Sequence, residues 1–160
     1  MVVVDTVRGY AVTVCNGGTN PATRHWMFPP TPESPRASRE LVARACRDWG
    51  VDSEACEDAR LIATELVANV VDHAGTDCTL TFSLDDAGLR VEVRDFYPCP
   101  PPRPRPFDMN ARRGRGLQVV SMLSIRWGVN EFADGKSVWA VLPGVVPVSA
   151  EAQAPASHPG

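Results

Sequence analysis

The sequence predicts an α+β fold in which helices cover one face of a mixed, mostly antiparallel sheet, forming a two-layer α/β sandwich. Three observations support this fold class. Residues 35–75 carry helical periodicity, residues 78–96 alternate apolar and polar side chains, and residues 116–143 indicate a short helix followed by two strands. With 160 residues and 44% hydrophobic content, the chain is long enough for one domain with a real core and too short for two.

The first helix is expected over residues 35–49. Ser34 is a favoured N-cap residue, and Pro35 suits the first helical position because its missing N–H would have no partner there. Apolar residues then recur at helical spacing, and Gly50 is a typical stop.

A second and longer helix is expected to run to Gly75. Asp52 is its predicted N-cap residue, and Glu54 would lie near the positive end of the helix dipole.

A β-hairpin is expected next, because residues 78–86 and 89–96 alternate with a period of two across a short DDAG connection. The stretch 97–116 is rich in proline and arginine, so it cannot be regular structure throughout and is expected to be a functional or disordered loop. A short helix opening at Gly116, a strand over 125–132, a tight turn over 133–136 and a closing strand over 137–143 complete the pattern.

The folded domain is expected to span residues 22–143. Residues 1–21 combine a strand-like AVTV stretch with loop-forming residues, and we expect this segment to be poorly ordered. Residues 144–160 are rich in proline, alanine and serine, a composition typical of a disordered tail.

The composition excludes several classes of protein. A net charge of −3 and a pI of about 5.6 give no general attraction to nucleic acid or to an anionic membrane, so neither is expected as a partner. The five cysteines form no CxxC pair and have no zinc-finger spacing, which favours reduced thiols and a cytoplasmic location. The N-terminal stretch lacks the run of about 18 apolar residues that a membrane span needs.

Glu65, Asn69 and His73 recur at intervals of four along the second helix. At about 100° per residue they would lie together at the border of its apolar face. Polar groups at the margin of a core need partners, because an unpaired buried group costs on the order of 1 to 3 kcal/mol. The row is therefore either a set of water-exposed rim residues or the lining of a pocket, where these ligand types suit Mg²⁺ better than zinc.

Asp95 ends the second strand of the predicted hairpin. A carboxylate at such a position can accept a hydrogen bond from an exocyclic amine, although strand-end aspartates also form simple turns.

The stretch RRGRGLQVV places glycines at the entrance of a helix, where backbone N–H groups and the helix dipole favour an anion. Arg112, Arg113 and Arg115 would add charge-assisted contacts to phosphate, or would form a solvated segment without a ligand. The pattern is neither a Walker A motif nor a Rossmann fingerprint.

The order of these features resembles the ATP-binding domain of histidine kinases, DNA gyrase and related ATPases, the GHKL superfamily with its Bergerat-type fold. ELVANVVDHA is the most specific match, GRGLQVV is a good one and VEVRDFYPCPPP is partial. The resemblance covers roughly residues 22–143 and is greatest to the stand-alone anti-sigma-factor serine kinases of bacteria.

The resemblance implies a role for each matching residue. Asn69 would ligate Mg²⁺ bridging the phosphates of ATP, and Glu65 would be the general base that deprotonates a serine hydroxyl or water. His73 would line the phosphate side. Asp95 would accept a hydrogen bond from the adenine amino group, and Ser137 would help to fix the adenine pocket.

The same resemblance implies that Gly114 and Gly116 let a lid close on the triphosphate. Arg113, Arg115 and Leu117 complete the nucleotide-binding set implied for this segment.

Two functions of different classes follow from the resemblance. One is an ATP-dependent serine/threonine kinase that phosphorylates an antagonist protein and sequesters a sigma factor or another transcription regulator, with a homodimer implied. The other is a catalytically inactive partner-binding module of the same fold. The presence of Glu65 favours the kinase, whereas the absence of glycine from DFYPCPPP, where family members often carry it, favours the module.

Overall fold

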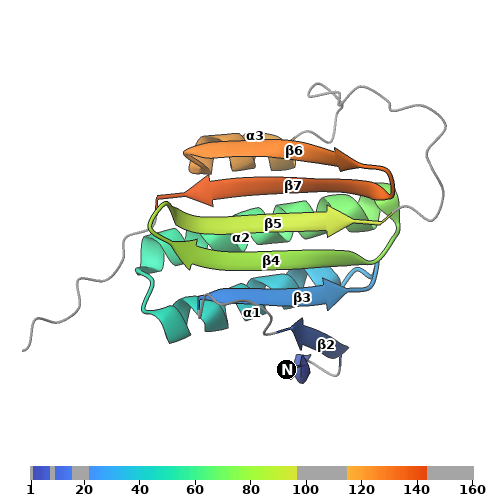
Figure 1. The fold of residues 1–160 in the computed structure, drawn as a ribbon, viewed down its shortest axis with the longest axis horizontal. Helices are drawn as coiled ribbons and strands as arrows, with labels where there is room; N and C mark the ends of the chain where they lie inside the picture. The colour runs from blue at the N-terminus through green and yellow to red at the C-terminus, as the bar shows by residue number, and fades with distance from the viewer. Residues whose placement is uncertain (1, 8–9, 16–21, 97–114, 144–160) are drawn as a thin grey trace, which may run out of the picture.

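The computed structural model describes residues 2–7, 10–15, 22–96 and 115–143. These residues form one seven-stranded sheet in the order β1-β2-β3-β4-β5-β7-β6, with the helices on one face (Figure 1). The elements are β1 (Val2–Val7), β2 (Tyr10–Cys15), β3 (Thr23–Phe28), α1 (Ser34–Trp49), α2 (Ser53–Asn69), the π-helical turn η1 (Val70–Ala74), β4 (Cys78–Asp85), β5 (Gly88–Asp95), α3 (Arg115–Leu123), β6 (Arg126–Phe132) and β7 (Gly135–Leu142).

This architecture confirms the predicted α+β sandwich. Every strand pair of the described sheet is antiparallel, so the parallel pairing that a mixed sheet would contain is not found within these residues. The order of elements brings β7 between β5 and β6, and the connection from β5 to β6 passes through α3.

Helix α1 begins one residue earlier than predicted. Its N-cap residue is Glu33 and not Ser34, because the carbonyl of Glu33 accepts the first helical hydrogen bond, from the N–H of Ala37 at 3.0 Å. The Ser34 hydroxyl donates to the carbonyl of Pro29 at 2.6 Å. The predicted end is confirmed, since Gly50 adopts the left-handed conformation with φ of 67°.

Helix α2 begins as predicted, with the Asp52 side chain accepting a hydrogen bond from the N–H of Ala55 at 3.0 Å. Its last part differs from the prediction. The turn Val70–Ala74 is π-helical, and the N–H of Gly75 donates to the carbonyl of Val70, five residues earlier. Such turns are rare and frequently occur at functional sites.

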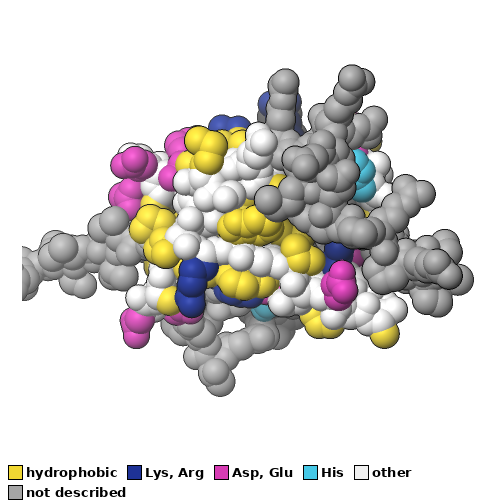
Figure 2. Space-filling model, turned by 90° about the horizontal axis from the view of Figure 1, so that it is seen from above, with side chains coloured by type: hydrophobic (Ala, Val, Ile, Leu, Met, Phe, Trp, Pro, Cys, Tyr) yellow, Lys and Arg dark blue, Asp and Glu magenta, His cyan; other side chains and the backbone are white. Residues whose placement is uncertain are grey.

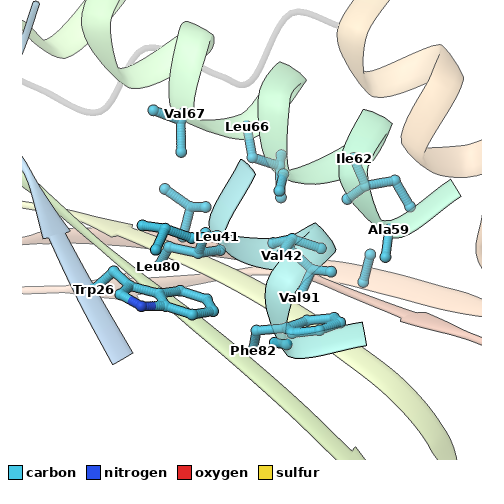
Figure 3. Packing of buried hydrophobic residues seen from close by; sticks show 14 of the residues in the cluster. Trp26, Leu41, Val42, Ala59, Ile62, Leu66, Val67, Leu80, Phe82 and Val91 are labelled. Carbon is cyan, nitrogen blue, oxygen red and sulfur yellow. The ribbon is translucent and has the colours of Figure 1, made fainter. Parts of the chain in front are cut away.

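The hydrophobic core lies between the sheet and the two long helices (Figure 3). Trp26, Phe82 and Val91 from three neighbouring strands lie in one cluster with Val42 of α1 and Ile62 of α2, and each is at most 2% exposed. Burying one such side chain is worth about 1.5 to 3 kcal/mol. This packing holds α2 firmly against the sheet, so its polar row has a defined position.

The first strands form a hairpin in a segment that we expected to be poorly ordered. Val2 pairs with Cys15 and Val7 pairs with Tyr10, and β2 joins the rest of the sheet through Val14 and Trp26. The valine-rich stretches have high β-propensity, and the loop-forming glycines and asparagines follow them in the sequence.

Candidate functional site

Glu65 and Asn69 lie on α2 as half-buried side chains, and neither forms a hydrogen bond with another described residue. Gly116, in the first turn of α3, lies directly against them. A Cβ atom added to Gly116 would be 2.8 Å from Oε2 of Glu65 and 3.4 Å from Nδ2 of Asn69. The structure therefore brings three predicted site residues together, and the glycine keeps the space beside both polar groups free of a side chain.

Asp95 is only 1% exposed at the end of β5. Its Oδ1 accepts a hydrogen bond from the backbone N–H of Lys136 at 2.9 Å. Burial raises the pKa of this carboxyl group, and the Lys136 hydrogen bond and the charges of Lys136 and Arg94 oppose that rise. A buried carboxyl group with one oxygen held by the backbone is suited to accept a hydrogen bond from a ligand with the other.

Gly135 leaves room for this arrangement. Its φ is +150°, and a Cβ atom there would lie 2.3 Å from the carbonyl oxygen of Asp95 and 2.9 Å from Oδ1. The sequence indicated only a tight turn at this position, and the glycine in ADGK was the signal that could have identified the close approach.

The C-terminal ends of α2 and β5 lie at the same end of the sheet (Figure 1). Cys78, which begins β4 just after α2 and η1, pairs directly with Asp95. The N–H of Phe96 donates to the Thr76 hydroxyl at 3.4 Å, which ties the end of β5 to the connection after η1. The α2 residues and Asp95, the two halves of the candidate site, therefore lie at the same end of the sheet.

Arg94 lies near the end of β5 on the open face of the sheet, which is the face opposite the helices. Its guanidinium lies 5.0 Å from the ring centre of Phe96 and 4.3 Å from that of Phe132, and it donates to Asp134 at 2.9 Å. These contacts join β5 to the β6–β7 turn, which carries the residues that hold Asp95. Sequence reasoning did not identify Arg94, because its partners are distant along the chain.

Among the described residues, neither Ser137 nor His73 forms a hydrogen bond with Glu65, Asn69 or Asp95. Ser137 is buried, but it pairs with Arg94 on the open face and is 3.5 Å from Nδ2 of Asn130, whereas strand alternation places Asp95 on the helix-covered face. His73 is exposed in the π-helical turn, because that turn interrupts the α-helical spacing of the row. The role of Ser137 in the adenine pocket therefore stays a prediction.

The remaining predicted residues belong to the lid segment. Arg113 and Gly114 lie outside the described residues, as does Arg112. The backbone of Arg115 begins α3, and Leu117 packs against the core from the same helix.

Within the described part of the chain, no group of three or more His, Cys, Asp or Glu side chains is positioned to hold a metal ion. No helix in the same residues is both long and apolar enough to span a membrane.

Comparison with known proteins decides the family. A family model for the histidine kinase-like ATPase domain matches residues 28–142. The chain belongs to this family. Residues 28–142 contain all the described residues of the candidate site, and membership implies a site for ATP.

Two individual proteins are similar to this histidine kinase-like ATPase domain. An uncharacterized protein of Streptomyces coelicolor is 35% identical over 79 residues, which are 47% of this chain and 75% of that protein. The crystal structure of the RsbU and RsbW domains of Rv1364c from Mycobacterium tuberculosis matches with a TM-score of 0.59 and 20% identity. That match covers 76% of this chain and only 32% of the solved one, so it supports the fold alone.

Proposed function

We propose that this domain binds ATP with Mg²⁺, phosphorylates a serine or threonine of an antagonist protein in the cytoplasm, and sequesters a sigma factor or another transcription regulator. The observation that carries the proposal is the contact of Gly116 with Glu65 and Asn69. It places a carboxylate and an amide, without hydrogen-bond partners among the described residues, at the first turn of a helix. Backbone N–H groups at such a turn favour phosphate.

The donor set on α2 fits a magnesium–nucleotide complex. Asn69 offers an amide oxygen, and Mg²⁺ commonly takes one or two protein oxygens while phosphates and water supply the rest. Mg²⁺, when bound, would neutralise charge on the phosphates of ATP. Asn69 would hold the ion, and Asp95 would accept a hydrogen bond from the adenine amino group through the oxygen that Lys136 does not hold.

Glu65 is the proposed general base. In this role its carboxylate removes the proton from the attacking hydroxyl as the oxygen bonds to the γ-phosphorus and ADP leaves. Gly116 leaves room for that carboxylate, because a Cβ atom at this position would lie only 2.8 Å from its Oε2. Most of the catalysis would then come from positioning and from screening of charge.

The first test is isothermal titration with ATP, with and without Mg²⁺. We expect magnesium-dependent binding by the wild type and a loss of affinity of about tenfold or more in Asn69→Ala, because a lost contact to a charged group is worth about 1.5 kcal/mol or more. Glu54→Ala, in the exposed first turn of the same helix, is the control and should bind as the wild type does. Absence of binding under every condition would refute the nucleotide site.

Asp95→Asn tests the adenine end of the site. The asparagine oxygen can still accept from Lys136, but its NH₂ group would face the adenine amino group, so we expect ATP affinity to fall about 10- to 100-fold. Nucleotides that lack an exocyclic amine, such as ITP, should lose less. An equal loss for ATP and ITP would contradict the assignment.

The pH dependence of Asp95 has a defined sign. Because the pKa is raised in the folded state, the folded protein binds this proton more tightly than the unfolded chain does. The contribution of Asp95 to stability is therefore largest below its ordinary pKa and is lost as the pH rises through the raised pKa. Denaturation across this window should show a steeper loss for the wild type than for Asp95→Asn.

A second candidate function is a partner-binding module without phosphotransfer. Phe96, the residue after Asp95, contacts the Arg94 guanidinium through its ring, and its N–H donates to the Thr76 hydroxyl. The backbone that follows the proposed adenine pocket is therefore held in place at an aromatic residue. Capture of the same partner with and without ATP, together with no ADP formation, would favour this function.

A further inference from the structure

Two cysteines lie on either side of the connection between α1 and α2. Cys46 is in the last turn of α1 and Cys56 is in the first turn of α2. Both are free thiols. Cys46 is 1% exposed, and Cys56 is half-buried against the same hydrophobic cluster. In Figure 1 this connection lies at the end of the sheet opposite the C-terminal ends of α2 and β5, so the cysteines are separate from the candidate site.

The packing of the two helices makes the thiols neighbours. Burial raises the pKa of the Cys46 thiol, and Cys56 raises it further through a side-chain hydrogen bond and through its charge. Buried alanines adjoin both cysteines, Ala45 on α1 and Ala55 and Ala59 on α2. Small side chains at a helix contact allow the two helices to approach closely. The two sulfur atoms therefore meet inside a close helix contact.

Backbone hydrogen bonds hold both cysteines to the connection. The Cys46 carbonyl accepts from the N–H of Val51 at 2.9 Å, and the Cys56 N–H donates to the carbonyl of Asp52 at 3.0 Å. The connection of residues 47–55 is thus short and anchored on both sides. The native fold positions the two thiols, so they do not have to be gathered from distant parts of the chain.

We infer that Cys46 and Cys56 form a dithiol site that hydrogen peroxide oxidises to a disulfide between α1 and α2. The Cys56 sulfur bonds to one peroxide oxygen as the O–O bond breaks, and the other oxygen leaves as hydroxide and takes up the thiol proton. The Cys46 sulfur then displaces the oxygen of this sulfenic acid, which leaves as water with the Cys46 proton. Two thiols and one peroxide give one disulfide and two water molecules.

The exposure of the two thiols sets the order of these steps. Cys56 reaches the solvent, whereas Cys46 is buried, and a thiol buried in apolar surroundings reacts poorly by itself. Once Cys56 is oxidised, Cys46 is already beside it, and a group held in place reacts far faster than one that must diffuse. In a reducing compartment the dithiol is the resting form and the disulfide is transient. This inference goes beyond the proposed function, since it needs no nucleotide.

The test is oxidation of the full chain by hydrogen peroxide without ATP, followed by alkylation and tryptic mapping. Trypsin cuts after Arg47, so peptides 45–47 and 48–60 stay together only through a disulfide. We expect this joined peptide in the oxidised wild type, and we expect dithiothreitol to separate it. Oxidation of Cys56 to sulfinic acid without the joined peptide would overturn the inference. So would a disulfide from either residue to another cysteine in its place.

Three variants test the assignment of the two thiols. Cys46→Ala should stop the reaction at the sulfenic acid of Cys56, which dimedone labels, and Cys56→Ala should leave Cys46 reduced. Cys78→Ala is the matched control, because Cys78 is also 1% exposed but begins β4, where it pairs with Asp95. It should form the joined peptide as the wild type does. Dimedone labelling of Cys46 in Cys56→Ala would contradict the order of the steps.

Peroxide also oxidises exposed methionines to the sulfoxide, and this reaction can be followed separately. Met122 of α3 is 83% exposed, and Figure 2 shows apolar side chains gathered on the side of the molecule that carries α3 and β6. Met122 falls in tryptic peptide 116–126, so its sulfoxide does not alter the joined peptide. Diamide, an azo compound that takes up the two thiol hydrogens, should give the same joined peptide.

The disulfide should also stabilise the domain, because closing the loop restricts the unfolded chain. The Tm of the wild type oxidised by diamide should lie about 5 °C or more above that of the same sample after dithiothreitol. Cys56→Ala should show no such difference. A linked wild type with an unchanged or lower Tm would overturn the inference, because the native fold would then not hold the two sulfur atoms at bonding distance.

Discussion

Glu65→Gln is expected to lower phosphotransfer about 100- to 10,000-fold, the range typical for loss of a general base. Glutamine keeps the shape of the side chain beside Gly116 but cannot take a proton. ATP affinity should therefore change little, which separates the chemical step from binding. Formation of ADP from ATP with water as the acceptor measures the effect without a known protein substrate.

Glu54→Gln is the matched control for this experiment. Glu54 lies on the same helix, in its exposed first turn, away from Gly116. Its variant should form ADP at the wild-type rate. If Glu65→Gln were as active as Glu54→Gln, Glu65 would not be the base, whereas parallel losses of ATP binding and turnover would indicate a binding role.

Gly135→Ala is expected to destabilise the domain by about 2 to 4 kcal/mol. The new methyl group would lie 2.3 Å from the carbonyl oxygen of Asp95, and the φ of +150° is unfavourable for alanine. The backbone of β5 would have to move, because no flexible side-chain end is available to yield at that distance. Thermal denaturation should show a fall in Tm of roughly 10 °C.

Gly75→Ala separates the close contact from backbone strain. Gly75 also has a positive φ, +62°, but no atom lies within 4 Å of the position of its Cβ. This variant should lose only about 1 to 2 kcal/mol. If the two variants were equally destabilised, the contact between Gly135 and Asp95 would not be what holds that end of the sheet.

Local signals were sufficient to predict most elements of the central domain. The Asp52 cap and the glycine stops at Gly50 and Gly75 are confirmed, and each depends on residues that are near one another in the sequence. The start of the first helix was predicted one residue too late, because Glu33 and not Ser34 accepts the first helical hydrogen bond, from the N–H of Ala37.

The surroundings of Asp95, the proposed adenine end of the candidate site, could not be predicted in the same way. Lys136 lies 41 residues from Asp95, and their hydrogen bond exists only because β7 pairs with β5. The face of Ser137 also depends on that register, which a single sequence does not define. Asp95 itself could be proposed from the sequence, because a carboxylate at a strand end is a local feature. The residues that hold it became visible only in the fold.

The π-helical turn Val70–Ala74 acts as a one-residue insertion in the helix. The wider turn takes up that residue, so the helix leaves it in nearly the direction that an uninterrupted α-helix with one residue fewer would have. Glu65 and Asn69 lie before the turn, so deleting one residue there would leave both beside Gly116. The change would fall on the connection to β4, where the Thr76 hydroxyl accepts from the N–H of Phe96. Activity and the anchoring of β5 could therefore be altered separately in one helix.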